Sequence, residues 1–197
     1  MILIANSCVG GYLYKNELNQ SFQTPFIWSL VDFNSMLYLI QNLNTINFNK
    51  IEMTDTGNIK DGTWSFSINI DSNVLVKYIH YKFSMDAKKP TVKGIDVFYN
   101  KIWEYIIEKY RTRVHRMICA NTTPTFIFAN WFDVPETKLT YERLSILNSL
   151  QRNNIICATD IIYPEFQHLK QVTREPNKRL YNTGLAKKIY MEILHSI

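Results

Sequence analysis

The chain has 197 residues, of which 46% are hydrophobic and 20% charged, and its formal net charge is +5. Such a chain is long enough to bury its own hydrophobic core, which excludes a disordered protein and a small disulfide-dependent scaffold. The three cysteines include no CxxC pair, so the sequence favours reduced thiols over a disulfide framework, and no metal site is expected.

The N-terminal residues MILIA form a short apolar run that ends at Asn6. A run of this kind, ended by turn-forming residues, predicts a buried strand over Met1 to Ala5. It has neither the basic start nor the length of a signal peptide. No stretch of the sequence reaches the roughly 20 apolar residues that a membrane span requires. We therefore expect a cytoplasmic protein without a transmembrane segment.

One helix and three strands are predicted next. Asp32 can cap a helix in which apolar residues recur every three or four positions as far as Leu43. Three strands are then predicted, at Lys50–Thr54, Thr63–Ile70 and Val74–Phe83. The second alternates apolar and polar residues, and we expect it to pair with the third as an antiparallel edge.

The second half of the chain alternates between helices and strands. The apolar periodicity and the candidate caps predict a helix over Ile95–Cys119, a strand over Thr125–Ala129, a helix from the cap Thr140 to about Arg152, a strand over Ile155–Ala158 and a helix over Gly184–His195. Because long structureless loops are uncommon, part of the stretch from Tyr163 to Thr183 is expected to be helical. The whole pattern predicts a single α/β domain over residues 1–197. It would be a three-layer sandwich with a mostly parallel, Rossmann-like sheet and an antiparallel edge.

Polar residues follow three of the predicted strands. Ligands of open parallel sheets bind beyond the carboxyl ends of the strands, so these residues predict one shared crevice. The predicted crevice contains Asn6, Ser7, Cys8, Asn130, Trp131 and Asp160, with His80 near its rim. Gly10 and Gly11 would let the backbone approach a phosphate closely. Alternatively, the polar residues at the strand ends only cap turns and helices.

Two further features allow both a chemical and a structural interpretation. The sequence allows three roles for Cys8. It is either a nucleophile with His80 as its base, a small residue that lines a pocket, or a buried structural thiol. Lys109, Arg113 and Arg116 share one face of the long predicted helix, where arginine suits phosphate. The alternative for these three is a solvated helix face.

Several short segments carry a resemblance to a known family. NSCVGGYLY, TPFIW, IHYKFSMDA and KYRTRVHRM resemble segments of the exopolysaccharide-biosynthesis family of uncharacterised proteins. The last two are also similar to the related papain-like cysteine peptidase family. The resemblance implies an α/β domain found with glycan-synthesis genes. It also implies that Cys8 and His80 occupy the positions for which the related family is named a cysteine peptidase family.

Three functions are compatible with these observations. The first is a glycosyltransferase-like enzyme that transfers sugar from a nucleotide sugar to a glycan or a modified nucleic acid. Arg113 or Arg116 would neutralise the donor phosphates, and Asp160 would be the base that accepts the acceptor's proton. The second is a cysteine hydrolase or acyl transferase with Cys8 as nucleophile. The third is a non-catalytic nucleic-acid-binding module. The chain from Phe166 onward has six Lys or Arg but only two acidic residues, and such a basic segment attracts phosphate.

Overall fold

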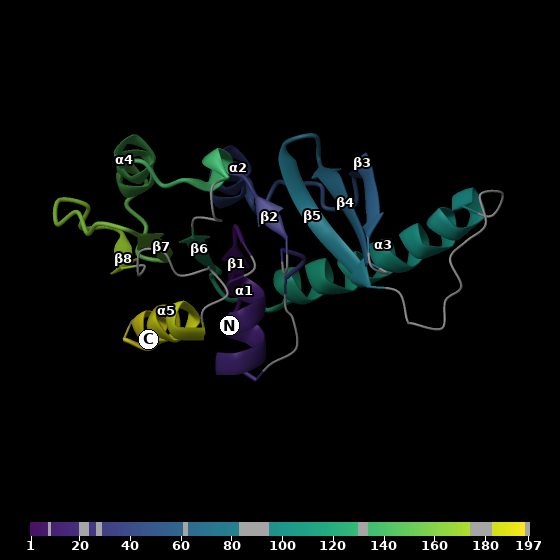
Figure 1. The fold of residues 1–197 in the computed structure, drawn as a ribbon. Coiled ribbons are helices and arrows are strands. Elements are labelled where there is room, and N and C mark those ends of the chain that lie inside the picture. Colours follow the sequence, from purple (N-terminus) through teal and green to yellow (C-terminus); the bar gives the residue numbers. More distant parts are fainter. Residues whose placement is uncertain are drawn as a thin grey trace.

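The structure is a computed structural model that describes residues 1–7, 9–19, 24–26, 29–60, 63–82, 95–129, 134–173 and 183–195. In several of the helices and strands only the backbone is described: residues 55–60, 63–64, 78, 80–82, 95–102 and 183. The described part contains a parallel and an antiparallel sheet of four strands each, with helices around them (Figure 1). This arrangement confirms the predicted α/β class.

The parallel sheet has the strand order β1-β6-β7-β8. Its strands are β1 (Leu3–Ala5), β6 (Thr125–Ala129), β7 (Ile155–Thr159) and β8 (Lys170–Thr173). The first three match the predicted strands, whereas β8 was not predicted. It lies in the stretch from Tyr163 to Thr183, part of which was expected to be helical, and residues 174–182 of that stretch lie outside the described residues. Only Val172 of β8 is fully buried, which leaves little hydrophobic pattern to read. The strand forms because the edge of β7 offers it parallel hydrogen bonds.

The antiparallel sheet has the order β2-β5-β4-β3 and is larger than the predicted edge pair. It consists of β2 (Leu30–Val31), β5 (Val74–Lys82), β4 (Thr63–Ile70) and β3 (Ile51–Lys60). The predicted pairing of β4 with β5 is confirmed, whereas β3 continues six residues beyond its predicted end and β2 was not predicted. The alternation in β4 is also confirmed, because Phe66, Ile68 and Ile70 are buried together in the core.

Helices cover both faces of the parallel sheet. Figure 1 shows α2 (Phe33–Asn42) and α4 (Tyr141–Ser149) on one side, and α1 (Val9–Tyr12) with α5 (Thr183–Leu194) on the other. Alternate residues of each strand therefore enter different cores. In β7, Cys157 packs on the side of α2 and α4, and Ile156 packs on the side of α1 and α5. This is the three-layer arrangement expected for strands that are apolar on both faces.

Helix α3 (Ile95–Cys119) connects the two sheets. The Trp103 ring of α3 packs edge-on against Phe66 of the antiparallel sheet, with centroids 6.1 Å apart. Farther along, Tyr110, Val114 and Met117 enter the core that α2 and α4 share with β6 and β7. No helix in the described part of the chain combines the length and apolarity needed to cross a bilayer.

The caps of two helices are those that the sequence predicted. Asp32 Oδ1 accepts a hydrogen bond from Ser35 N at 3.0 Å, and Thr140 Oγ1 accepts one from Arg143 N at 3.3 Å. Each cap satisfies a backbone N–H that has no partner within the helix. Helix α4 ends at Ser149, slightly earlier than predicted.

Side chains protect the outer edge of β1, which is the edge strand of the parallel sheet. Tyr14, in the π-helical turn η1 (Leu13–Glu17) that continues α1, accepts a hydrogen bond from Leu3 N at 2.9 Å with its hydroxyl. Thr24 Oγ1 donates to Leu3 O at 3.1 Å. These two bonds occupy the positions that another strand would use, and so they block edge-to-edge association.

Candidate functional site

The carboxyl ends of β1, β6 and β7 meet at one edge of the parallel sheet, as the sequence predicted. Ala5 pairs with Ile127 and Ala129 pairs with Ala158, and both pairings are parallel. The Asn6–Ser7 pair directly after β1 and the Thr159–Asp160 pair at the end of β7 therefore lie along this edge, which we call the carboxyl edge.

Asn6 connects the carboxyl edge to the antiparallel sheet. Its backbone N–H donates to Ile127 O, and its backbone carbonyl accepts from Val31 N in β2, both at 3.0 Å. Because that carbonyl is used by β2, the Asn6 side chain takes the next hydrogen bond with β6. Its Oδ1 accepts from Ala129 N at 2.8 Å. One residue thus fixes the relative position of three strands at the candidate site.

Several polar atoms at this edge are buried without a hydrogen-bond partner among the described residues. They are Asn6 Nδ2, Ser7 Oγ, Thr159 Oγ1 and Ser29 Oγ, the last from the residue before β2. Their side chains are at most 3% exposed. A buried polar group without a partner costs about 1–3 kcal/mol, so any group that reached these atoms and supplied hydrogen bonds would stabilise this edge.

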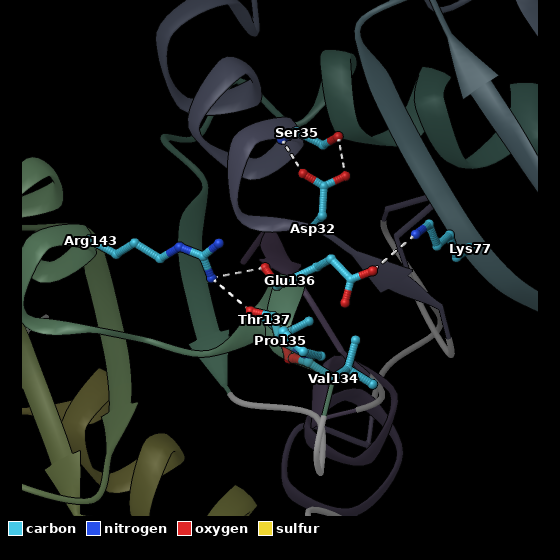
Figure 2. A network of polar contacts seen from close by, with 8 residues as sticks. All are labelled: Asp32, Ser35, Lys77, Val134, Pro135, Glu136, Thr137 and Arg143. Atoms are coloured by element: carbon cyan, nitrogen blue, oxygen red, sulfur yellow. Dashed lines mark hydrogen bonds and ion pairs between the residues drawn. The ribbon is translucent and has the colours of Figure 1, made fainter.

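The segment that follows β6 is held firmly beside this edge. Its 3-10 turn η3 (Pro135–Thr137) lies beside Arg143 of α4, whose Nη1 donates to the carbonyls of Pro135 and Glu136 at 3.0 and 3.2 Å (Figure 2). The same Nη1 also donates to the carbonyl of Lys138 at 2.7 Å. On the other side of the turn, Lys77 Nζ of β5 lies 3.5 Å from Glu136 Oε1. A hydrogen bond from its own backbone N–H, and then the charge of Lys77, lower the pKa of Glu136.

Some of the predicted site residues are outside the described part of the chain. Cys8, Asn130 and Trp131 are among them, so their place in a shared crevice stays a prediction. Asp160 is exposed directly after β7. His80 lies in β5 opposite Ser65, three residues beyond Lys77, and only its backbone is described.

The two predicted glycines lie in helix α1, and Gly10 has a packing role. A Cβ atom at Gly10 would be 2.9 Å from the Cβ of Ala5, so glycine allows α1 to pack directly on β1. The Gly10 N–H donates to Ser7 O at 3.4 Å. Gly11 is buried in the same helix. A role of either glycine in phosphate binding stays a prediction.

The last turn of α3, which carries Arg116, does not lie at the carboxyl edge. Lys109 Nζ lies 4.2 Å from the centre of the Tyr105 ring, and burial, with the nearby Arg116 charge, lowers the pKa of Arg113. The C-terminal end of α3 leads into the start of β6 and so lies at the opposite, amino edge of the parallel sheet. Arg116 is therefore not placed with Asp160.

Sequence reasoning missed Ser29 and the structural role of Asn6. Strand β2 has only two residues, too few for a recognisable pattern, so nothing marked Ser29 as part of this edge. The double use of Asn6 depends on β2 and β6, which come from distant parts of the chain.

Comparison with known proteins shows that the N-terminal part of the chain is similar to an uncharacterised family. Residues 1–93 match the model of a family described as "Domain of unknown function (DUF1919)". The matched segment contains Asn6, Ser7, Cys8 and His80, and it ends before α3. No curated protein matches the chain.

Proposed function

We propose that the protein is a transferase that binds a nucleotide-activated sugar at the carboxyl edge and passes the sugar to a glycan or a modified nucleic acid. The observation that supports this proposal best is the group of buried, unpartnered atoms from Asn6, Ser7 and Thr159. The Asn6 amide N–H can donate to a ligand rich in hydroxyl groups, and the two hydroxyls can both donate to it and accept from it. The resemblance to the exopolysaccharide-biosynthesis family adds the link with glycans.

In this proposal Asp160 accepts the proton of the attacking acceptor hydroxyl. Its exposure at the end of β7 leaves it within reach of a large acceptor. The acceptor oxygen forms a bond with the anomeric carbon of the sugar, while the bond from that carbon to the diphosphate oxygen breaks. The nucleoside diphosphate leaves with the bonding electrons, and no metal ion is invoked. Lys109, Arg113 and Arg116 are not assigned to the donor phosphates, because α3 ends at the amino edge.

Thermal unfolding in the presence of nucleotide sugars tests the proposal. UDP-, GDP- and CDP-linked sugars are each added to the protein, and at least one is expected to raise the melting temperature. The variant Thr159→Val removes the buried hydroxyl with little change of shape. We expect it to melt at a higher temperature without ligand and to lose the ligand-induced rise.

The matched control is Thr173→Val, because Thr173 pairs with Thr159 on the neighbouring strand and has an exposed side chain. This variant should respond to the nucleotide sugar as the unchanged protein does. Absence of any response to all three groups of nucleotide sugars would contradict the proposal. So would an undiminished response in Thr159→Val.

A cysteine hydrolase or acyl transferase is the second candidate, and one observation favours it. Helix α1 begins at Val9, the residue that follows Cys8 in the chain. The start of a helix favours a thiolate, which is the reactive form of cysteine. This candidate requires that Cys8 be alkylated faster than the exposed Cys119 near neutral pH, and that Cys8→Ala abolish activity. Equal alkylation rates would exclude it.

A further inference from the structure

A cleft of about 680 Å³ opens at the amino edge of the parallel sheet, on the side opposite the candidate site. It lies where α2 and α3 end and where β1, β6 and β7 begin, since Ile2, Pro124 and Asn154 all line it. Its volume is within the range of small-molecule sites, about 300–1,000 Å³. Neither the sequence reasoning nor the family match assigns a role to it.

The cleft has an apolar floor and a rim of amide and hydroxyl groups. Ile2, Phe48 and Phe126 belong to the floor and are buried in the core below it. Asn44, Asn121, Thr122 and Arg152 are exposed along the rim. None of these four side chains has a hydrogen-bond or ion-pair partner within the described part of the chain. They are therefore available to a ligand without loss of an existing bond.

The charges around the cleft favour an uncharged ligand. Arg152 carries the one full charge among the described residues that line it, and no carboxylate lines it. The C-terminal ends of α2 and α3 lie beside the same space, since Asn42 of α2 and Met117 and Ile118 of α3 line it. Each helix end carries about half a negative charge, so the two together roughly balance Arg152. An anion would be repelled by the negative helix ends, and a cation would be repelled by the Arg152 guanidinium.

We propose that this amino-edge cleft binds uncharged sugar units of a glycan. Sugar hydroxyls both donate and accept hydrogen bonds, as the side-chain amides of Asn44 and Asn121 and the hydroxyl of Thr122 do. The C–H face of a sugar ring suits an apolar floor. The cleft is on the opposite edge from Thr159 and Asp160, so it is a secondary site that holds glycan without taking part in a reaction. The inference does not depend on the proposed transferase activity.

Nuclear magnetic resonance of the ¹⁵N-labelled full chain tests this inference. Cellobiose, maltose and N,N′-diacetylchitobiose are titrated as neutral probes, and glucose is compared with glucuronate and glucosamine to test the effect of charge. We expect at least one neutral disaccharide to shift the side-chain amide signals of Asn44 and Asn121 in a saturable way. Glucose should bind more tightly than either charged monosaccharide.

Two sets of variants make the test specific. The double variant Asn44→Ala with Thr122→Ala should weaken disaccharide binding by about fivefold or more, because it removes two hydrogen-bonding groups from the rim. Asn153→Ala changes an exposed amide just outside the cleft and should leave binding unchanged. Thr159→Val, at the other edge, should also leave it unchanged. The inference is overturned if no neutral disaccharide shifts these signals, if the double variant binds normally, or if a charged monosaccharide binds as tightly as glucose.

Discussion

The side-chain carbonyl of Asn6 accepts a hydrogen bond from the backbone N–H of Ala129 at 2.8 Å, and both residues are completely buried. This bond replaces a backbone bond between β1 and β6, because the Asn6 carbonyl pairs with Val31 of the antiparallel sheet instead. The junction of the two sheets and the candidate site therefore depend on the same residue. Its remaining amide group, Nδ2, has no partner among the described residues.

Asn6→Ala is expected to lower the free energy of unfolding by about 1–3 kcal/mol, because it leaves the buried Ala129 N–H without an acceptor. Urea unfolding followed by circular dichroism measures the change. Asn153→Ala, at an exposed position, is the control and should stay within about 0.5 kcal/mol of the unchanged protein. If both variants unfold alike, the side chain of Asn6 does not hold the strands together.

Gly10→Ala is expected to destabilise the protein by about 1–3 kcal/mol, because the new methyl group would lie 2.9 Å from the Ala5 Cβ and push α1 away from β1. The control is Gly184→Ala, at an exposed position in α5, where alanine should be neutral or stabilising. Thermal unfolding of the two variants compares them directly. A Gly10→Ala protein as stable as the control would mean that α1 and β1 can move apart at little cost.

Because of Tyr14, the free energy of unfolding is expected to fall at alkaline pH. Burial raises the pKa of Tyr14 to about 12, although the hydrogen bond with Leu3 partly opposes this. The folded state thus holds the phenol proton more tightly than the unfolded chain, whose tyrosines titrate near pH ~10. The protonated phenol therefore contributes to the free energy of unfolding. This contribution is fully present below pH ~10 and is lost as the pH rises towards 12, and the whole loss is about 2–3 kcal/mol.

Urea unfolding at pH 8 and pH 11 tests this dependence. Tyr14→Phe should be less stable than the unchanged protein at pH 8, because Leu3 N loses its acceptor. Between pH 8 and pH 11, the free energy of unfolding of Tyr14→Phe should fall less than that of the unchanged protein. Tyr141→Phe, which changes a half-exposed tyrosine, should show the unchanged pH dependence. The same loss of stability in both variants would rule out Tyr14 as the source.

Arg143→Ala is expected to lower stability by about 1–2 kcal/mol, because the guanidinium bonds three carbonyls of the segment after β6 and lies over the Phe33 ring at 4.9 Å. Lys77→Ala removes the ion pair with Glu136 on the other side of the same turn and should cost less than about 0.5 kcal/mol, since exposed ion pairs contribute little. Urea unfolding ranks the two variants. The opposite order would show that the ion pair, rather than Arg143, holds this turn.

Alkylation should distinguish the two cysteines that the structure describes. Burial raises the pKa of the Cys157 thiol in β7, whereas Cys119 is exposed at the end of α3. Iodoacetamide at pH 8 should therefore modify Cys119 in the folded protein and Cys157 only after unfolding. Mass spectrometry of the digested protein locates the modification. Rapid labelling of Cys157 without denaturant would show that β7 is accessible to solvent.

Elements with a strong local pattern were predictable. The apolar runs of β1, β6 and β7 indicated strands buried on both faces, and the caps Asp32 and Thr140 marked the starts of α2 and α4. Strands β2 and β8 were missed, because they have two and four residues and form only where a neighbouring strand offers hydrogen bonds. Their existence depends on tertiary pairing rather than on local preference.

The sequence by itself determined the α/β class and the position of Asn6, Ser7 and Asp160 at strand ends, since periodicity and strand length are local properties. It did not determine that the eight strands of the described residues divide into two sheets, or that Asn6 joins the sheets through its backbone carbonyl while its side chain bonds β6. These bonds form between segments that are distant in the chain, 123 residues apart for Asn6 and Ala129. The amino-edge cleft likewise follows from where two helices end beside three strands. Only the packed chain brings these groups together, and burial then makes each unpaired polar atom costly.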